Sequence, residues 1–113
     1  MTKGIVSHPI VTPANVNCEN IMLTVVTIEP GSTMPAHRHS DSELVYYVID
    51  GEAEVILGLK KSPVRAGTAI YVPKGVTHGW FKVKRRLTYV AAIAPPIEEQ
   101  YKSLYASWKR DGF

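Results

Sequence analysis

The chain has 113 residues, of which 45% are hydrophobic and 20% charged, a balance that excludes a disordered or fibrous protein and suits one globular domain. Its net charge of +3 comes largely from two basic runs, at 60–61 and 82–86. Both runs fall where turns between strands are expected, and no nucleic-acid-binding motif accompanies them, so we expect no nucleic-acid partner.

The single cysteine, Cys18, excludes an internal disulfide bond and fits a reducing compartment. The first residues lack the apolar core and cleavage site of a signal peptide. The longest plainly apolar run, LVYYVI, is far too short to cross a bilayer. We therefore expect a cytoplasmic protein with no membrane partner.

Short β-branched and aromatic segments follow one another along the chain, separated by many of the 8 prolines and 8 glycines. The first runs from 20 to 31 and ends in Pro-Gly. Residues 43–58 read as two strands hinged at Asp50–Gly51, a typical hairpin signal. Further strands are predicted at 67–75, 78–83 and 87–95. This spacing predicts an all-β sandwich or barrel, in one domain over residues 1–113.

The end of the chain has a different period. Apolar residues recur there at helical spacing, at Ile97, Tyr101, Leu104, Tyr105 and Trp108. This pattern predicts an α-helix over about 97–110, with acidic residues near its start and basic residues near its end, as the helix dipole favours. We expect its apolar side to pack on the outside of a sheet, in the same subunit or in a neighbouring one.

The segment PAHRHSDSE contains two histidines and two acidic residues at odd-numbered positions. On an extended chain His37, His39 and Glu43 point to one face, and Asp41 is a rival carboxylate. Imidazole together with carboxylate suits a transition metal better than Ca or Mg. A further ligand has to come from elsewhere, and His78 follows a Pro-Gly turn at which a strand re-enters the sheet.

Two stretches of the sequence resemble the motifs of the cupin superfamily. The first, GSTMPAHRHSDSELVYYVIDG, fits G-x5-H-x-H-x3,4-E-x6-G from Gly31 to Glu43, and the second, GTAIYVPKGVTHGWFK, fits G-x5-P-x-G-x2-H-x3-N through His78. In this second stretch Lys82 replaces the final Asn, which is not a metal ligand in the family.

The first motif also departs from the family pattern, because seven residues instead of six separate Glu43 from Gly51. Counting back from Gly51 would place Leu44 in the glutamate position. We expect a bulge in LVYYVID to absorb the extra residue and to keep Glu43 facing inward.

The resemblance implies a cupin jelly roll, an antiparallel β-barrel over about 20–95 with a C-terminal α-helix. It also implies one mononuclear divalent transition metal, Fe, Mn, Ni or Zn. By position, the ligands would be His37, His39, Glu43 and His78. Such a set would leave open positions on the ion, as a catalytic metal requires.

A small-molecule pocket is expected beside these ligands. If Glu43 faces inward, Tyr47 shares its face, and Trp80 and Lys82 share the parity of His78. Tyr47 is then a candidate to donate a proton, and Tyr47, Trp80, Lys82 and Met22 are candidates to contact substrate. Core packing is the alternative for the aromatic residues. An inward Lys82 would attract an anionic substrate, whereas at the rim it would lead into the basic turn.

Three functions are compatible with this site. The one that we expect is a dioxygenase-like enzyme, in which a redox metal binds O2 and substrate together, and the other two are alternatives. The second is a non-oxidative isomerase, lyase or hydrolytic enzyme whose metal acts as a Lewis acid. The third is a non-catalytic metal- or ligand-binding cupin. On family grounds we also expect a homodimer, to which the tail helix and the N-terminus could contribute.

Overall fold

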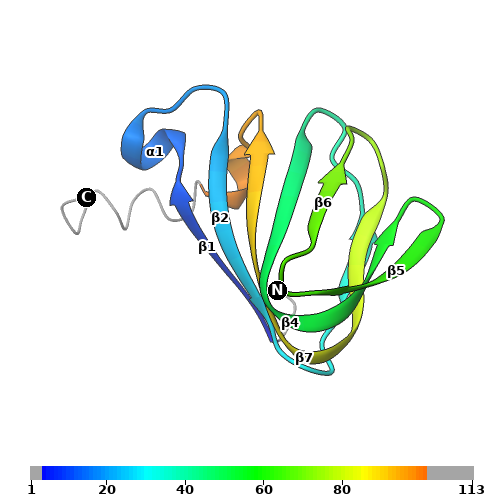
Figure 1. Cartoon of the computed structure of the whole chain (residues 1–113). Helices are drawn as coiled ribbons and strands as arrows, with labels where there is room; N and C mark the ends of the chain where they lie inside the picture. The colour runs from blue at the N-terminus through cyan, green and yellow to red at the C-terminus, as the bar shows by residue number, and fades with distance from the viewer. Residues whose placement is uncertain (1–3, 102–113) are drawn as a thin grey trace.

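The computed structural model describes residues 4–101, and nearly all of this part of the chain belongs to antiparallel strands or to the turns between them (Figure 1). The strands are β1 (Ile5–Val11), β2 (Met22–Ile28), β3 (Met34–His37), β4 (Glu43–Leu57), β5 (Lys60–Arg65), β6 (Ala69–Val72) and β7 (His78–Ala94). A short helix, α1 (Pro13–Val16), follows β1, and a 3-10 turn, η1 (Glu98–Gln100), follows β7. The expected all-β class is confirmed.

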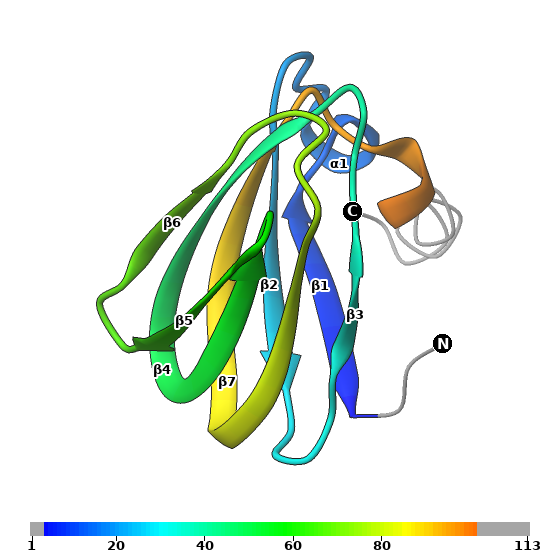
Figure 2. The same cartoon turned by 90° about the vertical axis from the view of Figure 1, so that its right-hand side faces the viewer.

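Two long strands, β4 and β7, bend the sheet into a roll. The strand order is β1-β2-β7-β4-β5, with β6 paired to β4 and β3 paired to β7. The first half of β4 lies between β6 and the second half of β7, and its second half lies between β5 and the first half of β7. Both strands therefore belong to two layers, as the view turned by 90° shows (Figure 2). This arrangement is the expected jelly roll.

The bend in β4 falls at the glycine that the sequence marks as a hinge. Gly51 has a φ of +102°, and a Cβ added there would clash with the backbone of Arg86 on β7. The strand continues through this point, so the hairpin predicted at Asp50–Gly51 is wrong. The close approach of β7 explains why a glycine is needed even though the chain does not turn back.

A bulge immediately before this bend decides which side chains of β4 face the core. The pairing of β4 with β7 shifts by one residue between Val48 and Asp50. Before the shift Leu44 and Val48 are buried, and after it Ala53 is buried, so the inward positions change from even to odd numbers. A bulge is thus present before Gly51, but it does not keep Glu43 facing inward as predicted, which is described with the site.

The core lies between the two layers and includes three aromatic side chains in mutual contact. The ring centroid of Tyr46 is 5.8 Å from that of Trp80 and 4.7 Å from that of Tyr89, and the rings of Trp80 and Tyr89 are 5.0 Å apart. All three side chains are buried. Aromatic pairs at such distances add to the stability that their buried area provides.

Each end of the described chain bears on a predicted boundary. Strand β1 lies before the expected start of the barrel near residue 20; it is an edge strand, where a proline such as Pro9 is tolerated. At the other end, residues 98–100 of the predicted helix over 97–110 form the 3-10 turn η1, and the residues from 102 onward lie outside the described part. No helix within residues 4–101 is long and apolar enough to cross a membrane.

Candidate metal centre

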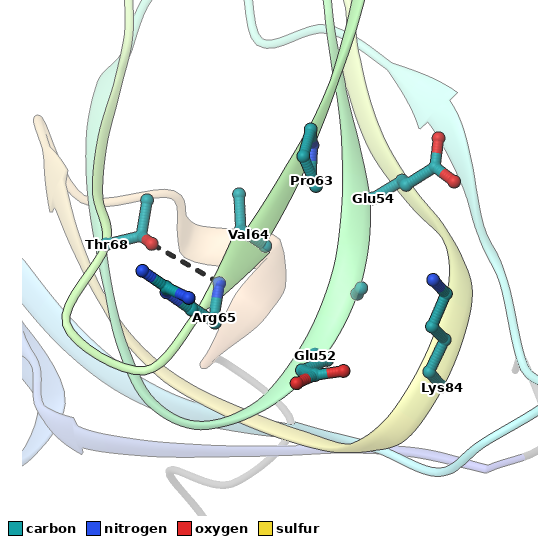
Figure 3. Close-up of a pocket in the computed structure, with 8 residues that line it drawn as sticks. Glu52, Glu54, Pro63, Val64, Arg65, Thr68 and Lys84 are labelled. Atoms are coloured by element: carbon teal, nitrogen blue, oxygen red, sulfur yellow. Dashed lines mark hydrogen bonds between the residues drawn. The ribbon is translucent and has the colours of Figure 1, made fainter.

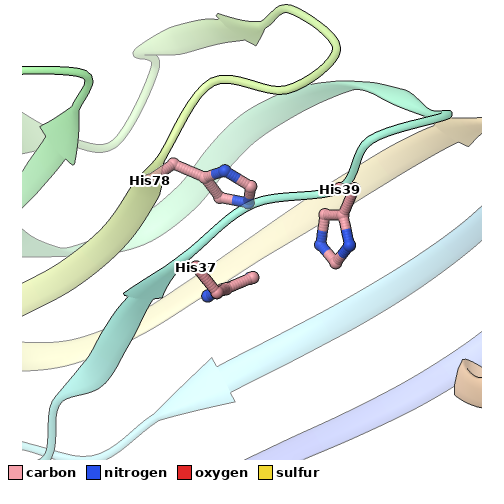
Figure 4. A group of neighbouring side chains, drawn as sticks. All are labelled: His37, His39 and His78. Atoms are coloured by element: carbon pink, nitrogen blue, oxygen red, sulfur yellow. The ribbon is translucent and has the colours of Figure 1, made fainter.

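Three histidines from the two motif segments meet at one end of the roll (Figure 4). His37 ends β3, His39 lies in the loop after it, and His78 begins β7, where it pairs directly with His37. The ring centroids lie 4.4 Å apart for His37–His78, 5.0 Å for His37–His39 and 5.3 Å for His39–His78. One ring nitrogen of each lies within 4.8 Å of the others.

A tight turn holds the second motif against the first. Gly75 adopts a φ of +75° in the turn that precedes His78. Its N–H donates to the carbonyl oxygen of His39 at 2.8 Å. The backbone that carries one histidine therefore positions the turn that introduces another, which explains why a glycine is placed there.

Hydrogen bonds to backbone carbonyl groups set the proton positions of two rings. Nδ1 of His37 lies 2.8 Å from the carbonyl oxygen of Pro35, and Nδ1 of His78 lies 2.9 Å from that of Val76. A carbonyl oxygen only accepts, so both Nδ1 atoms carry a proton, and in the neutral ring each Nε2 keeps a free lone pair. Nε2 of His78 is buried and has no hydrogen-bond partner within the described chain.

The surroundings of His39 and His78 favour the neutral form of these two imidazoles. Burial, followed by the neighbouring His37 and His78 rings, lowers the pKa of His39 from 6.5 to about 4. Burial also lowers the pKa of His78, while the bond to the Val76 carbonyl acts in the opposite direction and His37 adds a smaller lowering effect. Neutral rings with a free nitrogen are what a transition-metal ion binds, so the three residues fit such an ion.

Glu43 does not join this cluster, and its predicted inward orientation is wrong. Its side chain is exposed on the other face of β4, where Oε1 accepts a hydrogen bond from the hydroxyl of Tyr71 at 2.7 Å. The bulge before Gly51 places Leu44 in the inward position instead, as counting back from Gly51 suggests. Within residues 4–101 the metal-competent group consists of histidines alone.

The predicted pocket residues are also placed elsewhere. Tyr47 follows Glu43 to the exposed face, and the neighbouring Tyr46 takes the inward position. Met22 and Trp80 are fully buried in the core. Lys82 is exposed, with a φ of +49°, and its Nζ lies 3.6 Å from Glu54 at the surface. The positive φ marks a local break in the alternation of β7, which parity counting from His78 could not reveal.

A cavity of about 160 Å³ adjoins the histidines, between strands β1, β2 and β3 and the centre of the sheet. Its lining includes His37, His39, Leu44, Tyr46, Thr24 and Ala91. Ser7 on β1 and Gln100 on η1 also line it, and neither was singled out by the sequence. The sequence could have identified Tyr46, because counting back from Gly51 places Leu44, and therefore Tyr46, on the inner face of the strand. No local feature of the sequence identifies Ser7.

A larger hollow of about 420 Å³ lies away from the histidines, beside β5 (Figure 3). Two carboxylates and two cations line it, from Glu52, Glu54, Arg65 and Lys84. The backbone N–H of Arg65 donates a hydrogen bond to Thr68 Oγ1 at 3.3 Å. Its charges are mixed and it contains no metal-competent group within the described residues, so the histidine cavity is the better candidate site.

The family model described as "Cupin domain" matches residues 24–86, which include both motif segments and all three histidines. The chain belongs to the cupin family. The histidines of this cupin thus lie where the resemblance implied, whereas its fourth position holds Leu44.

Several known proteins are similar to this chain. An uncharacterized protein of Streptomyces coelicolor is 29% identical over 77 residues, covering 68% of this chain and 72% of its own length. Polyketide synthase CurC of Streptomyces cyaneus is 27% identical over 90 residues, covering 76% of this chain and 58% of its own length.

A solved structure extends the comparison. Polyketide cyclase RemF from Streptomyces resistomycificus superposes with a TM-score of 0.70 at 24% identity, covering 84% of this chain and 70% of that one. This likeness establishes the shared fold. The chain spans little more than half the length of CurC, so activity does not transfer from these proteins without further evidence.

Proposed function

We propose that this cupin is an enzyme that uses a divalent transition metal, held by His37, His39 and His78, to act on a small organic molecule in the adjacent cavity. The observation that carries the proposal is the convergence of the three imidazoles, among them a buried Nε2 of His78 with no partner inside the described chain. An unpaired buried nitrogen costs stability unless something binds it.

The reaction class that the ligand set favours is Lewis-acid chemistry. Three neutral imidazoles leave the charge of a divalent ion uncompensated, whereas a carboxylate ligand would reduce it, so a bound ion would strongly polarise a carbonyl or enol oxygen. The names of CurC, a polyketide synthase, and RemF, a polyketide cyclase, support a non-oxidative reaction of a carbonyl compound.

The surrounding residues would position the substrate and exclude water. Leu44 and Ala91 present apolar surface, and Tyr46 and Tyr89 present aromatic rings. Burial raises the pKa of both tyrosines well above the ordinary value, with Tyr89 adding to the effect on Tyr46. Both hydroxyls therefore stay protonated and cannot serve as bases.

The dioxygenase-like reaction is the alternative that the same site supports, because three protein ligands leave positions open for both O2 and substrate. The two reactions differ in their need for O2. Turnover that persists under anaerobic conditions would support the Lewis-acid proposal, and turnover that stops would support the dioxygenase. A ligand that binds without any turnover under either condition would indicate a binding protein.

Metal content is the first test. Elemental mass spectrometry of untagged protein, before and after reconstitution with Fe, Mn, Ni or Zn, should find a near-stoichiometric ion. His37→Ala and His78→Ala should lose it, whereas His8→Ala, at an exposed position on β1, should retain it. A parent protein that binds none of these ions would contradict the proposed function.

A further inference from the structure

The histidine cavity has an uncharged lining apart from the imidazoles. Among the described residues that surround it, none is Asp, Glu, Lys or Arg. An anionic or cationic group placed away from the histidines would lose its hydration without gaining a partner, which is costly in an apolar site. The anionic substrate considered for an inward Lys82 is therefore not favoured, because Lys82 lies at the surface.

The size of the cavity limits the ligand further. Its volume of about 160 Å³ is close to the ~150 Å³ of an apolar protein cavity that accepts one benzene ring. A single six-membered ring with one or two small substituents matches this volume. Any larger part of a substrate would have to remain outside, near Ser7 and Gln100.

Small side chains on neighbouring strands create this space. Thr24 on β2 pairs directly with Ala91 on β7, which pairs with Tyr46 on β4. The inward neighbours along β2 and β7 are larger, for example Met22 and Ile93. Thr24 and Ala91 are thus smaller than the other inward side chains of β2 and β7. The cavity beside Tyr46 is the volume that these two side chains leave unfilled.

Thr24 is also the one polar side chain among the inward positions of β2. Its Oγ1 is buried and has no hydrogen-bond partner within residues 4–101. A buried hydroxyl without a partner is uncommon and costs stability, which suggests that a ligand group completes its bonding.

We propose that the substrate places one uncharged six-membered ring in this cavity, with an oxygen toward the three histidines and a second polar group toward Thr24. This inference rests on the proposed function, because the histidine-bound ion is what would receive the first oxygen. It adds a substrate class, which is a phenol- or enol-type ring compound without a charge at its far end.

Calorimetric titration of metal-loaded protein with benzoate and terephthalate tests the charge. Both probes offer a carboxylate to the ion, but only terephthalate carries a second charge at the far end of the ring. We expect terephthalate to bind at least tenfold more weakly. Equal or tighter binding of terephthalate would overturn the proposal.

Two variants test the cavity itself. Ala91→Leu fills the space and should weaken benzoate at least tenfold. Thr24→Val removes the hydroxyl but keeps the shape, so it should reduce by about fivefold any preference of the parent for 3- or 4-hydroxybenzoate over benzoate. Thr88→Val, on the outer face of β7, is the matched control and should change nothing.

The metal content of each variant distinguishes a failure of the ring site from a failure of the metal site. Unchanged benzoate affinity in Ala91→Leu with the metal retained would overturn the ring site and leave the metal site standing. A parent protein that binds no metal would overturn the proposed function and this inference with it.

Discussion

At the scale of the residue, the backbone around each histidine prepares it for its role. The carbonyl groups of Pro35 and Val76 each belong to a residue two positions before the histidine that they orient. The orienting bonds are thus local and form with the loops themselves. Such bonds fix the tautomer and leave Nε2 free, so little further ordering is needed when an ion binds.

Glu43 provides a test of the ligand set. Because its carboxylate is exposed and bonded to Tyr71, Glu43→Gln should change metal affinity by less than about twofold, whereas His37→Ala should abolish binding. Isothermal titration with Zn or Ni measures both. The side-chain carbonyl oxygen in Glu43→Gln can still accept the hydrogen bond from the Tyr71 hydroxyl, so we expect little change in stability. A tenfold loss of metal affinity in Glu43→Gln would show that Glu43 does ligate.

His39 provides a pH test on the metal-free protein. Its pKa is about 4 in the folded chain and 6.5 as the ordinary value, so between these pH values the unfolded chain binds more protons. Unfolding is then favoured as the pH falls from 6.5 to 4. The melting temperature should therefore fall across this window, and less steeply in His39→Gln. Parallel curves for the two proteins would contradict the lowered pKa.

At the scale of the element, strand β4 shows how one extra residue selects a face. The bulge between Val48 and Asp50 lets Leu44, Tyr46 and Val48 face the core on one side of the bend and Ala53 on the other. Without the bulge, odd-numbered residues would face inward along the whole strand. The absence of a carboxylate from the cluster and the tyrosine in the cavity both follow from the register of β4 before Val48.

Gly51 is the residue on which this bend depends. Gly51→Ala combines a positive φ with a clash against the backbone of Arg86, so we expect it to cost about 2–4 kcal/mol. Gly58→Ala is the matched control, because Gly58 also has a positive φ but no atom within 4 Å of an added Cβ. It should cost about 1 kcal/mol. Urea unfolding would compare them, and equal costs would mean that β7 moves away at little expense.

At the scale of the whole molecule, the candidate site joins segments that are distant in sequence. β3 has no partner other than β7 among the described strands, and His37 and His78 form one of their few registered pairs. A metal ion held by all three histidines would fasten β3 and its loop to β7. Binding should therefore stabilise the fold, in addition to any catalytic role.

Thermal unfolding with and without metal tests this coupling. An ion at about 100 times its Kd should add about 2.7 kcal/mol, which corresponds to a rise in melting temperature of roughly 10 °C or more for a domain of this size. A chelator should reverse the rise. His78→Ala should show no response, and a rise of the same size in that variant would indicate binding elsewhere on the chain.

The fold class and the three histidines could both be predicted from the amino-acid sequence. The features that carried these predictions are strand periodicity, the Pro-Gly turns and the glycine before His78. They are local in the sequence, so they can be recognised without information about distant contacts. The motif spacing was enough to imply a cupin, and the family match over 24–86 agrees with it.

Which side chains face the cavity could not be predicted in this way, because it depends on how the strands pair. The orientation of Glu43 and Tyr46 depends on a bulge whose position is set by the pairing of β4 with β7. The placement of Trp80 and Lys82 depends in the same way on how β7 bends over the core. Register and bulges arise from pairing between strands far apart in the sequence, so counting along one strand could not assign them.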